Sequence, residues 1–333
     1  MRLSCPIRAV VFAVFCLVAT AACQAALLNT VAGAQAAYSL RLLNDAYSGS
    51  AIEVRRGSDS TTMNIGFDAN GRLDTTALLN FVGSGDGYVV TWFDQAGGST
   101  ACNVTQSSTA LQPQIVAGGS VLTDPVNHLP ALRFNSDSLQ YTGGMAAEAM
   151  SIFTAGSWIS LPSGTNSNAQ RLWTMRMDNS SRAAAGGDYG SGAPRFAASY
   201  GTPGHTLAVG TTPIVAYQPF VQCYLLDASP TGNNDFMRLY VDGELAVSRT
   251  GLNVTIADAN YFNIGSQTTG ERYYNGLMQE LIVYHEALPE AARMQVEGNM
   301  MWLYAPEPGS ALMLLLGGLL VGVARGRRRR RAG

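Results

Sequence analysis

The sequence predicts an all-β domain, a jelly-roll β-sandwich that ends in one short helix. Two alternating apolar runs flank Asp242-Gly243, which is the strongest short signal for a β-hairpin. Apolar runs of strand length recur along the chain, with Gly, Ser and Asn between them. Only 13% of the 333 residues are charged and 36 are glycines, a composition typical of an extracellular β-rich protein. About 280 residues remain once both ends are set aside, which suits a single domain.

The first residues, 1–26, have the pattern of a secretory signal peptide. Arg2 and Arg8 precede an apolar run over residues 9–22, and Ala19-Thr20-Ala21 fits a small-x-small cleavage site. Cys23 would also suit a lipoprotein, although Thr20 stands where such signals prefer an aliphatic residue. We therefore expect export, with signal peptidase as a partner.

The middle of the chain contains strand signals in order. Asp74 predicts the N-cap of a short helix that runs to Phe81. Alternating or continuous apolar runs predict strands at 51–56, 87–95, 132–134, 139–141, 152–158, 172–177, 195–200, 206–209 and 220–226, with 114–116 as an edge strand. Trp92 and Trp158 fall within these runs and are expected in the core. Asp94 and Gln95 close a strand, and we expect their side chains to bond to local backbone.

The stretch from 276 to 284 predicts a strand at the centre of the sheet. Leu281 and Val283 share one face, and Ile282 and Tyr284 share the other, so both faces need cover. Pro289 then predicts the start of a helix, because its missing N–H costs nothing there. The spacing gives that helix an apolar side made of Met294, Val296, Met300, Met301 and Leu303.

Residues 236–304 resemble the closing half of a LamG-like, concanavalin-type jelly roll. The resemblance rests on Val241-Asp242-Gly243, on the strand ending Ile264-Gly265-Ser266, and on Glu280 followed by Leu-Ile-Val-Tyr and a short helix. This resemblance implies the fold, but it does not imply a function, because the fold hosts lectins, glycosidases and adhesion modules.

Residues 38–98 resemble the start of the α-L-arabinofuranosidase B catalytic domain, which removes arabinofuranosyl groups with retention. The motifs are Tyr47-Ser48-Gly49, the Arg-Gly-Ser-Asp-x-Thr-Thr run over 56–62, and Trp92-Phe93-Asp94-Gln95. The motifs fall in the family's order, and with the closing half the resemblance spans most of the mature chain. The family has several disulfides, and this sequence lacks most of the corresponding cysteines.

The second resemblance implies candidate catalytic residues. The family's nucleophile is a Glu within Met-Glu-Asn, and Met177-Asp178-Asn179 places Asp178 at that position. Aspartate is shorter by one C–C bond, about 1.5 Å, and catalysis tolerates such displacements badly. The family's acid/base follows an Ile-Gly turn, where this chain has Ser266 and Gln267. Glu271 is the remaining acid/base candidate. Asp178 is otherwise a surface residue or an acceptor for sugar hydroxyls.

Three residues are candidate carbohydrate-binding residues: Asn179, Tyr273 and Tyr274. Because adjacent strand residues point to opposite faces, one tyrosine ring should lie outside, where it stacks on a sugar or covers the sheet. Cys102 and Cys223 either form a disulfide or are two buried free thiols, and spacing does not decide between them. No His/Cys cluster suggests a metal, and we expect no cofactor.

The C-terminus has three parts in order: Pro306-Glu307-Pro308, an apolar run over 309–324, and Arg325 with the cluster 327–331. It resembles a PEP-CTERM sorting signal, which implies cleavage by an exosortase and delivery to the cell surface or matrix of a Gram-negative bacterium. The run of 16 residues is just short of the usual minimum of about 17 for a membrane helix. The alternative is a short membrane anchor with cytoplasmic arginines.

We therefore predict three regions: a signal peptide (1–26), a sandwich domain (27–305) and a sorting segment that anchors transiently in the membrane (306–333). The net charge is −2, and five of the 21 basic residues lie at 327–331, so the folded part is acidic and nucleic-acid binding is not expected. The expected function is binding or organising extracellular polysaccharide. An α-L-arabinofuranosidase and a structural matrix or adhesion protein are the alternatives.

Overall fold

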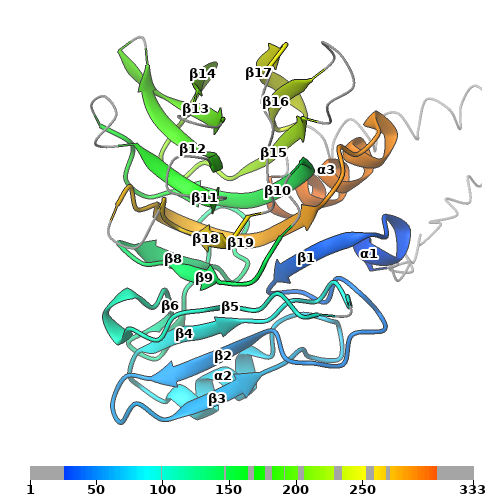
Figure 1. Ribbon diagram of the computed structural model, residues 1–333. Helices are drawn as coiled ribbons and strands as arrows, with labels where there is room; N and C mark the ends of the chain where they lie inside the picture. The colour runs from blue at the N-terminus through cyan, green and yellow to red at the C-terminus, as the bar shows by residue number, and fades with distance from the viewer. Residues whose placement is uncertain are drawn as a thin grey trace, which may run out of the picture.

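The computed structural model describes residues 26–305 except 99, 146–147, 164–168, 177–181, 191, 202–205, 229–234, 253–258 and 268–270. Two antiparallel sheets face each other, and a smaller sheet lies below them in Figure 1. The predicted all-β sandwich with a C-terminal helix is confirmed. Hydrogen-bonded pairs connect the three sheets, so the sandwich is nearly closed.

The first sheet has β19 at its centre. Along one edge, β19 (Asn275–Tyr284) pairs with both β1 (Ala34–Ser39) and β8 (Leu132–Asn135). On its other edge follow, in order, β10 (Ala149–Trp158), β15 (Phe220–Asp227), β16 (Phe236–Val241) and β17 (Glu244–Thr250). The second sheet contains, in order, β9 (Leu139–Tyr141), β18 (Tyr261–Ile264), β11 (Gln170–Arg176), β12 (Arg182–Gly190), β13 (Ala193–Tyr200) and β14 (Thr206–Pro213).

The smaller sheet, here called the N-terminal sheet, is built mainly from the first third of the chain. The strands follow one another across this sheet in the order β3 (Thr62–Ile65), β2 (Ile52–Arg56), β4 (Gly87–Trp92), β6 (Gln114–Ala117) and β8. The short β7 (Ser120–Val121) also pairs with β6. β5 (Val104–Thr105) joins β4 to β9. The remaining elements are α1 (Leu27–Thr30), α2 (Thr75–Val82), η1 (Thr109–Leu111) and α3 (Glu290–Tyr304).

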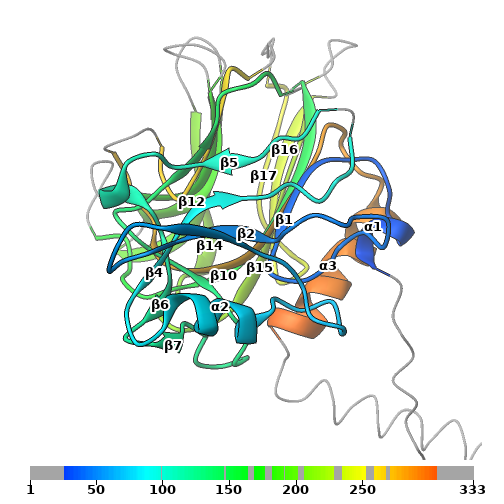
Figure 2. The ribbon, with the colours of Figure 1, turned by 90° about the horizontal axis from the view of Figure 1, so that it is seen from below.

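Buried side chains form two clusters on opposite faces of β19. Leu281 and Val283 belong to the larger cluster between the sheets, whereas Ile282 and Tyr284 belong to a smaller cluster under the helices. Figures 1 and 2 both place α1 and α3 on the same side of the molecule, where they cover that second face. The predicted central strand with cover on both faces is therefore confirmed.

The turns and helix starts follow the predicted chemistry. Asp242 and Gly243 have φ of 51° and 81°, both left-handed, as a tight hairpin turn between β16 and β17 requires. The Asp74 side chain accepts a hydrogen bond from Ala77 N at 2.9 Å, which caps α2. The α3 helix begins at Glu290, directly after Pro289.

The predicted apolar side of α3 is only half right. Val296 and Met300 are buried, but Met294 is 56% exposed. Arg293 and Glu297 are buried instead: they pair with each other one helical turn apart, and Arg293 lies 3.8 Å over the Tyr240 ring. A paired and stacked charge can occupy an interface position that hydrophobic periodicity assigns to apolar residues.

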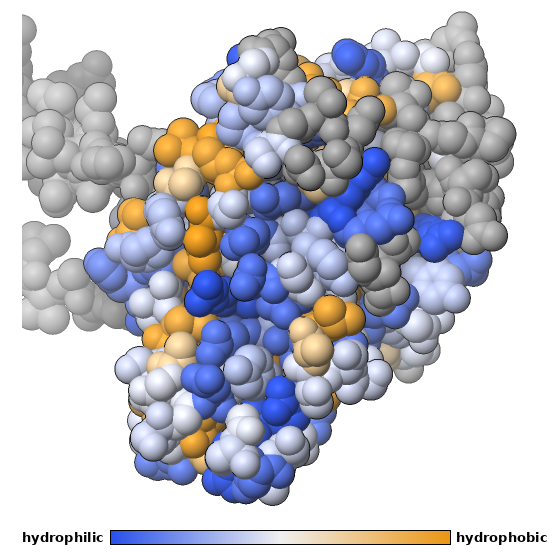
Figure 3. All heavy atoms as spheres, turned by 90° about the vertical axis from the view of Figure 1, so that its left-hand side faces the viewer, coloured by the Kyte–Doolittle hydropathy of each residue, from blue (hydrophilic) through white to orange (hydrophobic). Residues whose placement is uncertain are grey.

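Sequence patterning missed β12, because residues 183–187 are only alanines and glycines. The glycine at 186 is required: a Cβ there would lie 2.2 Å from Gln170 O across the bulge with β11. Among the described residues, no helix is long and apolar enough to cross a membrane. The side of the molecule in Figure 3 is mostly hydrophilic, with hydrophobic residues in small separate patches.

Candidate functional site

Several predicted site residues lie outside the described residues. These are Asp178 and Asn179, and in the C-terminal segment Pro306, Glu307, Pro308 and Arg325. The candidate nucleophile and the sorting signal therefore stay predictions.

The predicted tyrosine pair is divided between core and surface. Tyr274 is fully buried, and its hydroxyl lies 2.6 Å from Ser157 O and 2.9 Å from Leu277 O, so its prediction as a sugar platform is wrong. Burial also raises the pKa of Tyr274 well above its usual value. Tyr273 is half-buried and is the outer ring of the pair.

Glu271 is exposed and lies beside Gln267 at the end of β18. Gln267 Nε2 lies 3.4 Å from Glu271 Oε2, and Arg272 Nη1 donates to Gln267 Oε1 at 2.8 Å. Ser266, at the position where the resemblance expects an acid, is buried. Gln267, Glu271 and Arg272 therefore form a small polar cluster.

The cysteines and the residues expected in structural roles have clear places. Cys102 and Cys223 are both free and buried, and they belong to different hydrophobic clusters, so the disulfide alternative is wrong.

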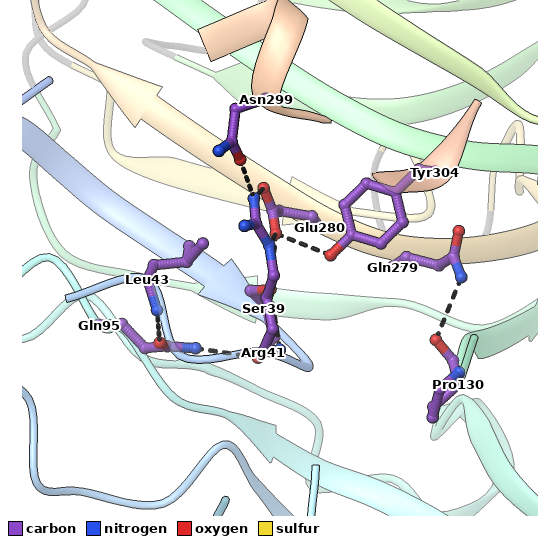
Figure 4. Close-up of polar contacts among 9 residues, drawn as sticks. All are labelled: Ser39, Arg41, Leu43, Gln95, Pro130, Gln279, Glu280, Asn299 and Tyr304. Carbon is purple, nitrogen blue, oxygen red and sulfur yellow. Dashed lines mark hydrogen bonds and ion pairs between the residues drawn. The ribbon is translucent and has the colours of Figure 1, made fainter. Parts of the chain in front are cut away.

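Asp94 Oδ1 accepts from Ala96 N at 2.9 Å and from the distant Ala37 N at 2.8 Å. Gln95 binds the backbone of β1 and of residue 43 (Figure 4). Both side chains hold the fold together, and the two tryptophans expected in the core are fully buried.

A row of buried polar side chains crosses the outer face of the second sheet. The members are Asn263, Thr174 and Ser199. Each lies in sequence between two core residues that point inward, and it therefore points outward. The flanking core residues are Phe262 and Ile264, Trp173 and Met175, and Ala198 and Tyr200, in the same order. Asn263 is directly opposite Thr174, which is opposite Ala184, which is opposite Ser199.

A second, charged row crosses the same face nearer the start of β11. Ala183 and Ala185 belong to the core, and a Cβ at Gly187 would also point inward at Ile214, so Asp188 points outward. Asp188 is opposite Arg195 on β13, and Arg171 Nη2 lies 3.8 Å from Asp188 Oδ2, too far for a direct hydrogen bond. Asp188 and Arg171 are each only 2% exposed.

Four buried atoms of these rows have no hydrogen-bond partner in the part of the chain that the structure describes. They are Asn263 Oδ1, Thr174 Oγ1, Ser199 Oγ and Asp188 Oδ2. A buried polar atom without a partner costs about 1–3 kcal/mol, so each needs an explanation such as a water, an ion or a ligand. The segments 177–181, 202–205, 253–258 and 268–270, which adjoin these strands in sequence, lie outside the described residues.

An aromatic side chain lies at the end of the neutral row. Tyr261 precedes Asn263 by two residues and thus shares its outer face, and it is 42% exposed. A tyrosine ring with one open face offers a stacking surface and a hydroxyl together. We call Tyr261, Asn263, Thr174, Ser199 and Asp188 the outer-face site. Its signal in the sequence is one polar residue between two apolar ones, as in Phe-Asn-Ile and Trp-Thr-Met.

The register between β11 and β18 is relevant to the predicted catalytic pair, Asp178 and Glu271. Arg176, the last described residue before Asp178, is opposite Tyr261, whereas Arg171 N bonds to Arg272 O next to Glu271. Five residues of strand, about 16 Å, separate Arg176 from Arg171. Glu271 thus lies at the opposite end of the β11–β18 pair from the point at which the chain leads to Asp178. A retaining glycosidase needs its two carboxyl groups about 5–5.5 Å apart.

Known proteins support the fold. A family model for the concanavalin A-like lectin/glucanases superfamily matches residues 135–292. A GH54 α-L-arabinofuranosidase soaked with a cyclic sulfate inhibitor is similar, with a TM-score of 0.61 and 16% identity. An arabinofuranosidase complexed with arabinofuranosyl-alpha-1,2-xylobiose has a TM-score of 0.58 and 15% identity. Both matches cover 81% of this chain but only 63% of the other chain. The search of curated proteins gives no match.

Proposed function

We propose that this protein is exported and binds extracellular polysaccharide through the outer-face site. The observation that supports the proposal is the set of four buried polar atoms, on adjacent strands of one face, that have no hydrogen-bond partner among the described residues. The concanavalin-like fold and its similarity to structures of arabinofuranosidases support a carbohydrate as the ligand.

The chemistry of the site suits sugar hydroxyl groups. A sugar hydroxyl donates to the oxygens of Asn263 and Asp188, and it can donate to or accept from the hydroxyls of Thr174 and Ser199. The Tyr261 ring offers a surface on which the apolar face of a sugar ring can stack. The site thus combines one aromatic surface with hydrogen-bonding atoms that have no partner among the described residues.

Affinity electrophoresis in gels that contain arabinan, arabinoxylan or an exopolysaccharide tests this function. At least one polysaccharide should retard the wild type, and Asp188→Asn should abolish the retardation while the protein still melts cooperatively. Glu290→Gln, which neutralises an exposed carboxylate at the start of α3, is the control. If Asp188→Asn migrates like the wild type in every gel, the outer face is not the binding site.

A second candidate function is glycoside hydrolysis, favoured by the buried carboxylate of Asp188, whose Oδ2 has no hydrogen-bond partner among the described residues, and by the exposed Glu271. Asp188 on β12 and the segment that contains Glu271 flank β11 on opposite sides, so about two strand spacings, or about 10 Å across the sheet, separate their backbones. An aryl arabinofuranoside assay separates the candidates. Wild-type turnover that is lost in Asp178→Asn or Asp188→Asn would establish the enzyme, and no turnover is the result that we expect.

The proposed location depends on the C-terminal segment. Deleting residues 306–333 should release the protein into the medium or periplasm if the segment is an exosortase substrate or an anchor. Cell fractionation of the full chain and the truncated chain measures this directly. If the truncated protein stays at the surface, the sorting proposal is wrong.

A further inference from the structure

A polar cleft of about 720 Å³ lies on the N-terminal sheet, far in sequence from the outer-face site. Its volume is within the range of about 300–1,000 Å³ that is usual for ligand sites. One cross-strand row of side chains lines it. Arg55 is opposite Tyr88, Tyr88 is opposite Gln114, and Gln114 is opposite Arg133, so the row spans β2, β4, β6 and β8.

Alternation along the strands explains why this face is polar. Val54, Val89 and Leu132, the chain neighbours of three row members, are fully buried in the larger core cluster. The row members must therefore point away from the core and into the cleft. Three strand spacings, about 14 Å, separate the backbones of Arg55 and Arg133 at the two ends of the row.

The two arginines are held differently. The Arg55 guanidinium lies 4.7 Å over the Tyr88 ring, and its Nε donates to Gln112 Oε1 at 2.7 Å. Arg133 Nε is buried and has no hydrogen-bond partner among the described residues. A guanidinium that is positioned beside a cleft with an unused donor is suited to a carboxylate, which it can bind with two parallel hydrogen bonds.

Two carboxyl groups lie among the residues that line the cleft. Asp86 accepts from Gly118 N at 2.9 Å, and Asp137 accepts from Asn135 N at 2.7 Å. Burial raises the pKa of Asp137 to about 6, although the bond from Asn135 and the charge of Arg133 oppose this. The ionisable groups that line the cleft are these two acids, Arg55, Arg133 and Tyr88, so the cleft becomes more positive below about pH 6.

We propose that this cleft is a second binding site, for an oligosaccharide that carries carboxylate groups. The Arg133 and Arg55 guanidinium groups bind uronate carboxylates, and the amides of Gln114 and Asn135 bind hydroxyl groups. The cleft lies on a different sheet from the outer-face site, so the proposal does not depend on the function of that site. The acidic net charge of the whole chain makes non-specific attraction of a polyanion a poor explanation for such binding.

Isothermal titration with a short oligogalacturonate, and with the neutral oligogalactoside of the same length, tests the proposal. The acidic probe should bind at pH 5 and more weakly at pH 8, and the neutral probe should bind at least tenfold more weakly. Arg133→Gln should weaken binding of the acidic probe at least tenfold, and Arg55→Gln gives a second, independent test. Arg249→Gln removes the same charge from an exposed position on β17 and should bind like the wild type.

Three outcomes would overturn the proposal: no binding of the acidic probe, equal binding of both probes, or equal losses in Arg133→Gln and Arg249→Gln. Asp188→Asn separates the two sites. It should leave the oligogalacturonate affinity unchanged, whereas a matching loss would assign the acidic probe to the outer-face site. Each variant is compared with the wild type by thermal melting, so a loss of binding in an unfolded protein is recognised as such.

Discussion

Polar groups are buried both around Glu280, beneath α3, and on the outer face of the second sheet, but only those around Glu280 have their hydrogen-bond partners among the described residues. Beneath α3, the Glu280 carboxylate accepts hydrogen bonds from Ser39 Oγ, Arg41 and Tyr304 OH at 2.7–2.9 Å (Figure 4). Asn299 Oδ1 accepts a further hydrogen bond from Arg41 Nη2 at 2.7 Å. On the outer face of the second sheet, four polar atoms are equally buried but have no partner among the described residues.

The two regions differ in whether their hydrogen bonds are completed inside the protein. The Glu280 group joins β1, β19 and α3, and its carboxylate is fully satisfied inside the protein, so it stabilises the fold and leaves nothing for a ligand. On the outer face, the four atoms have no hydrogen-bond partner among the described residues, at a cost in stability. Lack of a hydrogen-bond partner among the described residues is not sufficient by itself, because Thr154 and Gln222, whose side chains lie inside the sandwich, share this feature. Clustering on an outer face beside an exposed tyrosine distinguishes the site.

The largest loss of stability is expected when the hydrogen-bonded group around Glu280 is disrupted. Glu280→Ala leaves the Arg41 guanidinium in a mostly buried place without its carboxylate, together with Ser39 and Tyr304. Removing one partner of a buried pair costs about 3–5 kcal/mol, a large share of a typical domain stability of about 5–15 kcal/mol. Urea denaturation measures this. A loss below about 1 kcal/mol, as expected for the exposed Glu290→Gln, would show that the group contributes little.

A smaller effect, on binding alone, is expected at the exposed edge of the outer face. Tyr261→Ala removes the stacking surface and should weaken polysaccharide binding about fivefold, equivalent to about 1 kcal/mol. Stability should change by less than about 1 kcal/mol, because 42% of the residue is already exposed to solvent. Trp302→Ala removes another exposed aromatic, on α3, and should leave binding unchanged. Equal effects of the two substitutions would contradict a local role of Tyr261.

The smallest expected effect concerns pH and the cleft. The pKa of Asp137 is about 6 in the folded protein and about 4 in an unfolded chain, so the folded state holds the proton more tightly. This contribution to stability is present below about pH 4 and is lost as the pH rises through 6. Asp137→Asn keeps an acceptor for Asn135 N and should remove this dependence of stability on pH. The expected change in the free energy of unfolding is about 1 kcal/mol or less, because water screens the group. Identical pH profiles for both proteins would contradict the shift.

Local chemistry made much of the fold predictable. The Asp242-Gly243 turn, the Asp74 cap and the two apolar faces of β19 are each encoded within a few residues, and all three predictions are confirmed. β12 was missed because small residues give no periodic signal, although close packing against β11 requires them.

The outer-face site was harder to predict because its members are brought together only by strand pairing. Thr174, Ser199 and Asn263 are distant in sequence, and their register is not written in any one segment. Each could be noticed only as a single polar residue between apolar ones. The family resemblance implied Asp178, which lies outside the described residues, and strand alternation indicated Tyr273 or Tyr274, of which the structure places Tyr274 in the core.

The most direct test of the outer-face site compares two substitutions of the same shape. Thr174→Val and Thr154→Val each remove a buried hydroxyl that has no hydrogen-bond partner in the described part of the chain, one on the outer face and one in the interior. Both should raise the free energy of unfolding by about 1 kcal/mol, because an unsatisfied polar group is lost. Only Thr174→Val should also weaken polysaccharide binding, at least fivefold, in the same preparations. Unchanged binding in Thr174→Val, or an equal loss in Thr154→Val, would contradict the assignment of the outer face as the binding site.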